Sequence, residues 1–318
     1  MRIGIDLMGG DRPPQAIFEA VIEVSSGLKP GQEIVAFVEH SFYPELDRVV
    51  SEQNLPVTFV TTEETITPEE SPLFAVRRKK KSSMAAGMKL LKEEEIDAFV
   101  STGNTGALVA TSRLYLSCLP GVDRPALLVM MPTEKGRVAV LDVGANLLPK
   151  PAHLLTYAKL GSYYRTAVEG IAEPTVGLLN IGTEEQKGPK EIKETFHLLE
   201  NHFGDRFLGN IEGKDVFKGK IDVLITDGFT GNVFLKTAEG ISQFLLDFLR
   251  EKDPNLPLLT QLHAQFDYSE HPGALLIGLD HLVIKCHGHS DKRALLNGIM
   301  GAFTLAKNSP LPTIRSSL

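Results

Sequence analysis

The chain has 318 residues, of which 42% are hydrophobic and 23% charged, and its formal net charge is -7. These values are typical of a globular protein with a sizeable core, and they argue against a disordered chain or a nucleic-acid binder that depends on a global positive field. Cys118 and Cys286 are the only cysteines, too few for a disulfide framework or a cysteine metal cluster, which favours a reducing, cytoplasmic location.

Six short apolar runs organise the chain, and each ends at a turn rich in Gly, Asn, Asp and Thr. With their turns they occupy residues 2–11, 97–107, 138–146, 176–185, 221–232 and 282–291. Short runs rich in Val, Ile and Leu are typical of strands that are buried on both faces of a parallel sheet. Most are followed by a helical pattern, which places the turns at helix N-termini, where α/β proteins bind ligands. The sequence therefore predicts an α/β protein with a crevice suited to phosphate.

The remaining elements complete the alternation of strands and helices. In chain order we expect a helix after Pro13 and Pro14, a strand at 33–38, a helix at 44–53, a strand at 57–61, an irregular polar stretch at 62–81, a helix at 82–94, an amphipathic helical segment at 241–250, and a second apolar series at 258–266. The Pro- and Ser-containing tail at 308–318 is expected to be loose. Nothing marks a boundary, so residues 1–318 are predicted to form one domain, within which two lobes are allowed. Neither a signal peptide nor a membrane-spanning segment is expected.

The turn at 101–107 carries the strongest local signal. Gly103 and Gly106 flank Asn104 and Thr105 between a strand and an apolar helix, which suits an anion-binding turn with side-chain donors. A tight turn in which Thr caps the helix explains the same residues equally well. The similar composition of the turn from Asp227 to Asn232 favours binding, because two such turns facing one crevice would hold both ends of one reactant.

Carboxylates follow two other strands. Asp142 and Asn146 are candidates to face the same space, although an Asp at a strand end often only caps the next helix. Asp6 and Asp11 bracket a Gly-Gly pair; a metal site is one interpretation, and turn capping is the favoured one.

Two charged segments remain. Arg77, Arg78, Lys79, Lys80 and Lys81 form a run of five cations in an acidic chain. Such runs are usually solvated faces, but this one leads into a helix capped by Ser and is a candidate to recognise an acidic partner or a phosphate group. His287 opens a turn with His289 and Asp291, where it is either an acid, base or phosphate contact or a structural turn histidine.

Common nucleotide and hydrolase signatures are missing from the chain. It has no G-x-G-x-x-G after the first strand, no P-loop, no G-x-S-x-G and no H-E-x-x-H, which disfavours a kinase, a dinucleotide-dependent dehydrogenase of the usual kind, a serine hydrolase and a zinc protease. The chemistry is therefore expected to reside in the turns themselves.

Taken in order, these turns resemble one family. DLMGGD (6–11), STGNTGA (101–107), GVDRPA (121–126), LDVGAN (141–146), LLNIGTEE (178–185) and DGFTGN (227–232) are similar to the motifs of the PlsX phosphate acyltransferases of bacteria, and the resemblance extends from residue 1 to about 303. Three positions depart from the family pattern: Arg12 replaces a usual His, His289 replaces a usual Ser, and 241–268 is shorter than the helical hairpin with which some relatives touch membrane. Peripheral membrane contact is therefore left open.

The resemblance implies a three-layer α/β/α fold with a largely parallel sheet, similar to that of isocitrate and isopropylmalate dehydrogenases and of phosphotransacetylase. It also implies a cytoplasmic homodimer, without cofactor or metal, that transfers a fatty acyl group from acyl carrier protein to inorganic phosphate. The acyl phosphate product would feed a membrane glycerol-3-phosphate acyltransferase in phospholipid synthesis.

The expected roles follow from the turns and the resemblance together. The predicted catalytic residues are Asn104, Asp227 and Asn232. The predicted phosphate or acyl phosphate contacts are Gly103, Thr105, Gly106, Asp142, Asn146, Gly182, Thr183, Thr230 and His287, and the predicted docking site for acyl carrier protein is Arg77 to Lys81. No Ser or Cys has the context of an activated nucleophile, so we expect phosphate to attack the thioester directly. The alternatives are a phosphotransacetylase-like enzyme acting on coenzyme A thioesters and a non-catalytic regulator that binds phosphate or acyl groups.

Overall fold

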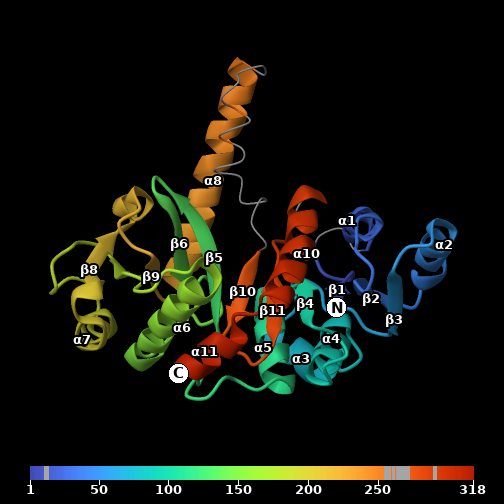
Figure 1. Ribbon diagram of the computed structural model, residues 1–318, viewed down its shortest axis with the longest axis horizontal. Coiled ribbons are helices and arrows are strands. Elements are labelled where there is room, and N and C mark those ends of the chain that lie inside the picture. Colours follow the sequence, from blue (N-terminus) through green and yellow to red (C-terminus); the bar gives the residue numbers. More distant parts are fainter. Residues whose placement is uncertain (11–13, 254–258, 260–261, 263–272, 289–291) are drawn as a thin grey trace. The chain divides into compact units, whose positions relative to one another are not determined.

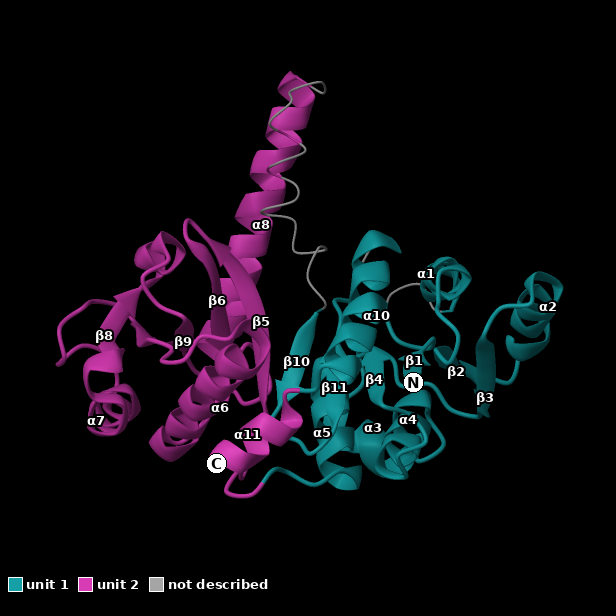
Figure 2. Ribbon diagram, viewed as in Figure 1, with its two compact units in different colours: residues 1–119, 269–309 teal, residues 120–268, 310–318 magenta. Residues whose placement is uncertain are grey.

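The computed structural model describes residues 1–10, 14–253, 259, 262, 273–288 and 292–318 (Figure 1). The chain folds as two compact units: unit 1 comprises Met1–Leu119 and Ser269–Ser309, and unit 2 comprises Pro120–Tyr268 and Pro310–Leu318 (Figure 2). Each unit combines helices with a mostly parallel set of strands, which confirms the predicted α/β class. The expectation of a single domain with two lobes stays a prediction.

Unit 1 is built on six strands in the order β3-β2-β1-β4-β11-β10. They are β1 (Arg2–Asp6), β2 (Glu33–Glu39), β3 (Val57–Thr62), β4 (Ala98–Ser101), β10 (Ala274–Ile277) and β11 (Leu282–Lys285). All neighbours are parallel except β10 and β11. The central strands β1 and β4 are almost wholly buried, which explains why they read as continuous apolar runs.

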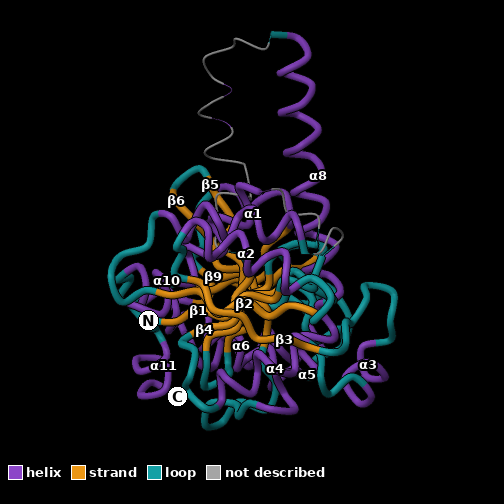
Figure 3. The backbone as a smooth tube through the Cα atoms, turned by 90° about the vertical axis from the view of Figure 1, so that its right-hand side faces the viewer, coloured by secondary structure: helices purple, strands orange, loops and turns teal. Residues whose placement is uncertain are grey.

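Helices cover both faces of the unit 1 strands. They are α1 (Gln15–Ser26), α2 (Tyr43–Gln53), α3 (Pro72–Arg78), α4 (Ser83–Lys92), α5 (Thr105–Tyr115) and α10 (Lys292–Lys307). Helices α1, α2 and α10 lie on one side of the strands, and α3, α4 and α5 lie on the other (Figures 1 and 3). Helix α4 approaches the strands closely, because a Cβ at Gly87 would lie only 2.0 Å from the ring of Phe99. The turns between strands and helices are thereby fixed from both sides.

Unit 2 has five strands in the order β5-β6-β9-β7-β8. They are β5 (Ala126–Thr133), β6 (Gly136–Leu141), β7 (Val176–Asn180), β8 (Phe207–Glu212) and β9 (Val223–Ile225). Strands β5 and β6 form an antiparallel hairpin, whereas β6, β9, β7 and β8 are parallel. The carboxyl ends of these four strands therefore lie at one edge.

The helices of unit 2 differ in how much of their surface is covered. They are α6 (Pro151–Glu169), α7 (Lys190–Phe203), α8 (Gly228–Lys252), α11 (Leu311–Ser317) and the 3-10 turns η1 (Gly204–Arg206) and η2 (Gly213–Lys218). Helix α6 packs on β6 and β9, where a Cβ at Gly161 would lie 2.7 Å from Val223 and 2.8 Å from Leu141. Helix α8 begins at the strands and extends far beyond them (Figure 2).

Two expectations from the sequence differ from the structure. The stretch at 62–81 contains helix α3, whose first turn is favoured by Pro72 at its N-terminus. The tail is not loose, because α11 is helical and its Ile314 is fully buried. The predicted apolar series at 258–266 lies mostly outside the described residues. Among the helices that are described, none is both long and apolar enough to cross a membrane.

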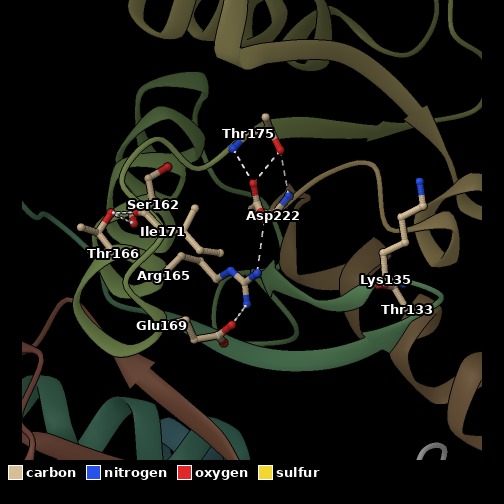
Figure 4. A network of polar contacts seen from close by, with 9 residues as sticks. All are labelled: Thr133, Lys135, Ser162, Arg165, Thr166, Glu169, Ile171, Thr175 and Asp222. Carbon is tan, nitrogen blue, oxygen red and sulfur yellow. Dashed lines mark hydrogen bonds and ion pairs between the residues drawn. The ribbon is translucent and has the colours of Figure 1, made fainter.

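A partly buried ion-pair network fixes α6 to the amino ends of β7 and β9 (Figure 4). Arg165, whose side chain is almost fully buried, pairs with Glu169 at 2.5 Å and with Asp222 at 3.3 Å. Asp222 in turn accepts hydrogen bonds from the backbone N–H and the hydroxyl of Thr175, both at 2.8 Å. Because Thr175 and Asp222 directly precede their strands, this network stabilises the edge opposite the predicted binding turns.

Candidate active site

In unit 1 the turns after β1, β4 and β11 share the carboxyl edge of three parallel neighbours. The buried carboxylate of Asp6 accepts hydrogen bonds from the backbone N–H of Met8 at 3.0 Å and from the hydroxyl of Ser101 at 2.7 Å. The Ser101 hydroxyl accepts one from the N–H of Gly103 at 3.0 Å. Burial raises the pKa of Asp6. Asp6 therefore organises both turns, in line with the capping interpretation.

The metal interpretation of Asp6 and Asp11 has no support in the part of the chain that the structure describes. No group of three or more His, Cys, Asp or Glu side chains is arranged there to hold a metal ion. Asp11 itself lies outside the described residues.

Asn104 caps helix α5 and anchors the preceding loop. Its Oδ1 accepts a hydrogen bond from the N–H of Ala107 at 3.0 Å, and its Nδ2 donates to the carbonyl oxygens of Pro68 at 2.9 Å and Glu70 at 3.4 Å. The N-cap is thus Asn104 and not Thr105. Because its polar atoms already have partners, this side chain has a clear structural role, and its catalytic role stays a prediction.

The glycines of the same turn lie in close packing, which at Gly106 is against the rigid ring of Pro72 and at Gly103 is against the flexible end of Met84. A Cβ at Gly103 would lie 2.3 Å from the Met84 methyl carbon, and one at Gly106 would lie 2.7 Å from Pro72. Thr105 and Gly106 are the first two residues of α5 and are partly exposed, so their N–H groups lack an acceptor within the helix. These two amides remain compatible with the predicted anion contact.

In unit 2, Asp142 is the centre of the turn after β6. Its Oδ1 accepts hydrogen bonds from the N–H groups of Leu127, Gly144 and Ala145 at 2.9–3.1 Å. Its Oδ2 accepts two from Asn146, from the backbone at 2.7 Å and from the side chain at 3.0 Å. The carboxyl group is fully buried, and burial raises its pKa. Both carboxylate oxygens of Asp142 therefore hold the turn in place. Its predicted contact with phosphate stays a prediction.

The turn at 142–146 lies directly against the turn after β9. The Asn146 carbonyl accepts a hydrogen bond from the N–H of Gly228 at 2.9 Å, while its side chain donates to the carbonyl of Pro125 at 2.8 Å. A Cβ at Gly228 would lie 2.5 Å from the main-chain carbonyl oxygen of Asn146, and one at Gly231 would lie 2.0 Å from the main-chain carbonyl oxygen of Asp142. Only glycine fits at both positions, so two of the predicted binding turns form one rigid assembly.

Asp227 and Asn232 play different parts in this assembly. Asp227 caps α8: its carboxylate accepts hydrogen bonds from the Thr230 N–H at 2.8 Å and the Thr230 hydroxyl at 2.7 Å. The Asn232 side chain is exposed, has no hydrogen-bond partner among the described residues, and lies 3.8 Å from the position of a Cβ on Gly144. Its amide is therefore free to contact a ligand at this edge.

The other predicted contacts lie at carboxyl edges but are less constrained. Thr183 is exposed in the loop after β7, and a Cβ at the buried Gly182 would lie 2.8 Å from the Glu184 carboxylate. The Asn210 side chain donates to the Glu184 carbonyl at 2.9 Å and so anchors this loop. His287 is exposed at the end of unit 1 strand β11. The predicted joint crevice of the turns at 101–107 and 227–232, which belong to different units, stays a prediction.

Lys285, at the end of β11, is a further residue of this edge that was not predicted from the sequence. Its ammonium group donates to the carbonyl oxygen of Thr102 at 3.2 Å and to that of Cys286. It thereby ties the turn after β4 to the neighbouring strand. The available signal was a cation at the end of an otherwise apolar strand.

The basic run divides into two groups. Lys79 pairs with Glu70 at 2.6 Å and Lys81 pairs with Glu63 at 2.7 Å. Arg77, Arg78 and Lys80 are exposed and have no ion-pair partner among the described residues. The guanidinium group of Arg78 lies 4.5 Å from the ring centroid of the exposed Phe74, a cation–π contact.

Comparison with known proteins identifies the family. The family model of the fatty acid synthesis proteins matches residues 1–312. A phosphate acyltransferase of Chlamydia felis is 45% identical over 320 residues, which covers 100% of this chain and 99% of the relative. The chain belongs to this family. It is therefore an acyltransferase.

Solved structures agree on the fold. A phosphotransacetylase from Streptococcus pyogenes aligns with a TM-score of 0.64 and 16% identity over 97% of this chain and 94% of that one. A branched-chain phosphotransacylase from Enterococcus faecalis V583 aligns with a TM-score of 0.60 and 13% identity over 96% and 99%. The predicted similarity to phosphotransacetylase is confirmed at the level of the fold.

Proposed function

We propose that this acyltransferase transfers a fatty acyl group from acyl carrier protein to inorganic phosphate, and that the acyl phosphate enters phospholipid synthesis. The observation that carries the proposal is the rigid pair of turns at 142–146 and 227–232, with the free amide of Asn232 beside it. Asp142 is fully engaged by five hydrogen bonds, so it is not a free carboxylate repelling phosphate. A neutral amide donor beside a rigid glycine-containing backbone suits an anion.

The proposed reaction needs no covalent enzyme intermediate. A phosphate oxygen attacks the thioester carbonyl carbon, the tetrahedral oxyanion collapses, and the C–S bond breaks to release the thiolate. Burial raises the pKa of the Cys286 thiol to about 11, which makes it a poor nucleophile at neutral pH. The enzyme then acts by positioning, which supplies up to roughly 7–11 kcal/mol of barrier reduction, and by donors to the oxyanion, each worth about 3–4 kcal/mol.

Acyl carrier protein is the proposed donor because helix α3 presents an exposed basic surface on a chain with a net charge of -7. Arg77, Arg78 and Lys80 are the cations of the run that no ion pair neutralises among the described residues. Opposite charge accelerates encounter and fixes orientation. This surface therefore suits an acidic carrier protein.

A donor comparison tests the proposal. Purified enzyme would receive inorganic phosphate with either acyl carrier protein thioester or the matching coenzyme A thioester, and hydroxylamine would trap the acyl phosphate formed. We expect a much higher kcat/KM for the carrier protein donor. A preference for coenzyme A would instead support the phosphotransacetylase-like alternative, and binding without turnover would support a regulator. A stable acyl-protein detected by intact mass without phosphate would contradict direct attack.

A homodimer is part of the proposal, supported by an apolar stripe on α8. Ile241, Phe244, Leu245 and Phe248 are all exposed and recur at the spacing of one helix face. A second copy of the chain would bury this stripe. Sedimentation of a Phe244→Glu variant should show a monomer; an unchanged dimer that no longer binds lipid vesicles would assign the stripe to peripheral membrane contact instead.

A further inference from the structure

Five large apolar side chains are exposed on two loops and on the first turns of helix α8 in unit 2, a group we term the apolar rim. Their exposed fractions range from 52% to 89%, whereas side chains of these types are normally buried. The apolar rim consists of Leu147, Leu148, Ile181, Phe229 and Val233.

The segments that carry the apolar rim follow the carboxyl ends of adjacent strands. The hydrogen bond from the Gly228 N–H to the Asn146 carbonyl, at 2.9 Å, joins the loop after β6 to the start of α8. Leu147 and Phe229 each follow one of these two bonded residues, so the backbones that carry them run close together. Val233 lies one helical turn after Phe229 and therefore on the same face of α8.

Ile181 extends the apolar rim to a third strand. It is the first residue after β7, and β7 pairs in parallel with β9, with Leu178 opposite Ile225. Adjacent strands lie about 4.8 Å apart, so the segments that follow β6, β9 and β7 span roughly 10 Å. The apolar rim is thus continuous with the turn that carries Asn232.

This juxtaposition of a free amide donor and an apolar surface fits a ligand with an anionic head and an alkyl tail. We propose that the apolar rim binds the acyl chain of the substrate and selects for its length, while the phosphate group lies at the turn at 227–232. The inference rests on the proposed function, since it assigns the tail of the same substrate. An alkyl group of four carbons is too short to span the three segments, so the apolar rim discriminates mainly among longer chains.

Alkyl phosphates test the proposal without turnover. Dodecyl phosphate, kept below its micelle concentration, and butyl phosphate share a head group and differ only in the tail. Because each buried methylene is worth roughly a fourfold change in affinity, dodecyl phosphate should bind the wild-type enzyme at least tenfold more tightly. The double variant Leu148→Asn/Ile181→Asn should weaken dodecyl phosphate about tenfold and butyl phosphate less than twofold.

Leu208 provides the matched control. It is 45% exposed but lies near the amino end of β8, at the opposite edge, so Leu208→Asn should leave the affinity for both probes unchanged. Equal weakening of both probes, or no weakening, in the double variant would overturn the proposal. Conversion of a wild-type dimer to a monomer by the same variant would also overturn it, because the apolar rim would then be a subunit interface.

Kinetics separates this inference from the proposed function. If wild-type enzyme forms acyl phosphate but its chain-length preference is unchanged in the double variant, only the acyl-chain site fails. If no acyl phosphate forms with any donor, yet dodecyl phosphate binds and depends on the apolar rim, only the proposed function fails.

Discussion

Asn104 and Asn232 look alike in the sequence but are expected to respond in opposite ways to replacement by Ala. Asn104→Ala removes an N-cap, which costs about 1 kcal/mol, and two hydrogen bonds to the carbonyls of Pro68 and Glu70. At roughly 0.5–1.5 kcal/mol per bond, and with the 3.4 Å bond at the low end, the expected loss of unfolding free energy is about 2–3 kcal/mol. Asn232→Ala removes an exposed side chain without a hydrogen bond to the described residues, so no loss of stability is expected.

Turnover should show the reverse order. If Asn232 contacts phosphate or the oxyanion, Asn232→Ala should lower kcat by about one to three powers of ten. If Asn104 acts only as the cap that its hydrogen bonds describe, the folded fraction of Asn104→Ala should retain turnover within about twofold; a loss as large as that of Asn232→Ala would support its predicted catalytic role. Urea unfolding and acyl phosphate formation would be measured on the same two preparations. Equal stability losses in both variants, or normal turnover in Asn232→Ala, would contradict these separate roles for the two side chains.

Three further outcomes are expected. Arg165→Ala leaves Asp222 and Glu169 without their buried partner, so it should lose about 3–5 kcal/mol of unfolding free energy in urea while turnover at low temperature persists. Burial raises the pKa of the Cys286 thiol to about 11 and keeps the thiol neutral. Its contribution to stability is therefore complete below the ordinary thiol pKa and declines as the pH rises toward 11. At pH 8 a thiol reagent should label only Cys118 until urea is added. Replacing the two arginines of α3 with Glu should raise KM for acyl carrier protein, whereas Arg48→Gln on α2, which opens only an exposed ion pair outside the basic run, should not.

Strands were predicted correctly where both faces are buried, because the sequence there is a continuous apolar run. The runs that become β1, β4, β6, β7, β9 and β11 are apolar because helices or other strands cover them. Helix α3 was not predicted, since its seven residues end in two arginines and show no apolar period. The Pro and Ser content of residues 308–318 predicted a loose tail. The segment is helical instead, because Ile314 is buried in unit 2.

The sequence predicted which turns form the candidate site but not the role of each side chain in them. The sequence identifies the turns at 101–107, 142–146 and 227–232 because their residue types are unusual. It does not show that the carboxylate of Asp142 accepts five hydrogen bonds, or that Asn104 and not Thr105 is the N-cap of α5. Part of each role depends on residues distant in sequence, Leu127 for Asp142 and Pro68 for Asn104, and no local pattern reveals those contacts.

The close contact between the turns at 142–146 and 227–231 constrains how this enzyme can be redesigned. At Gly228 and Gly231 any side chain would collide with main-chain atoms of the facing turn, so substitutions there would break the scaffold before they altered selectivity. The exposed loop positions Leu148 and Ile181 carry no such restriction. A library that randomises these exposed positions and keeps both glycines would explore new substrates on an intact framework.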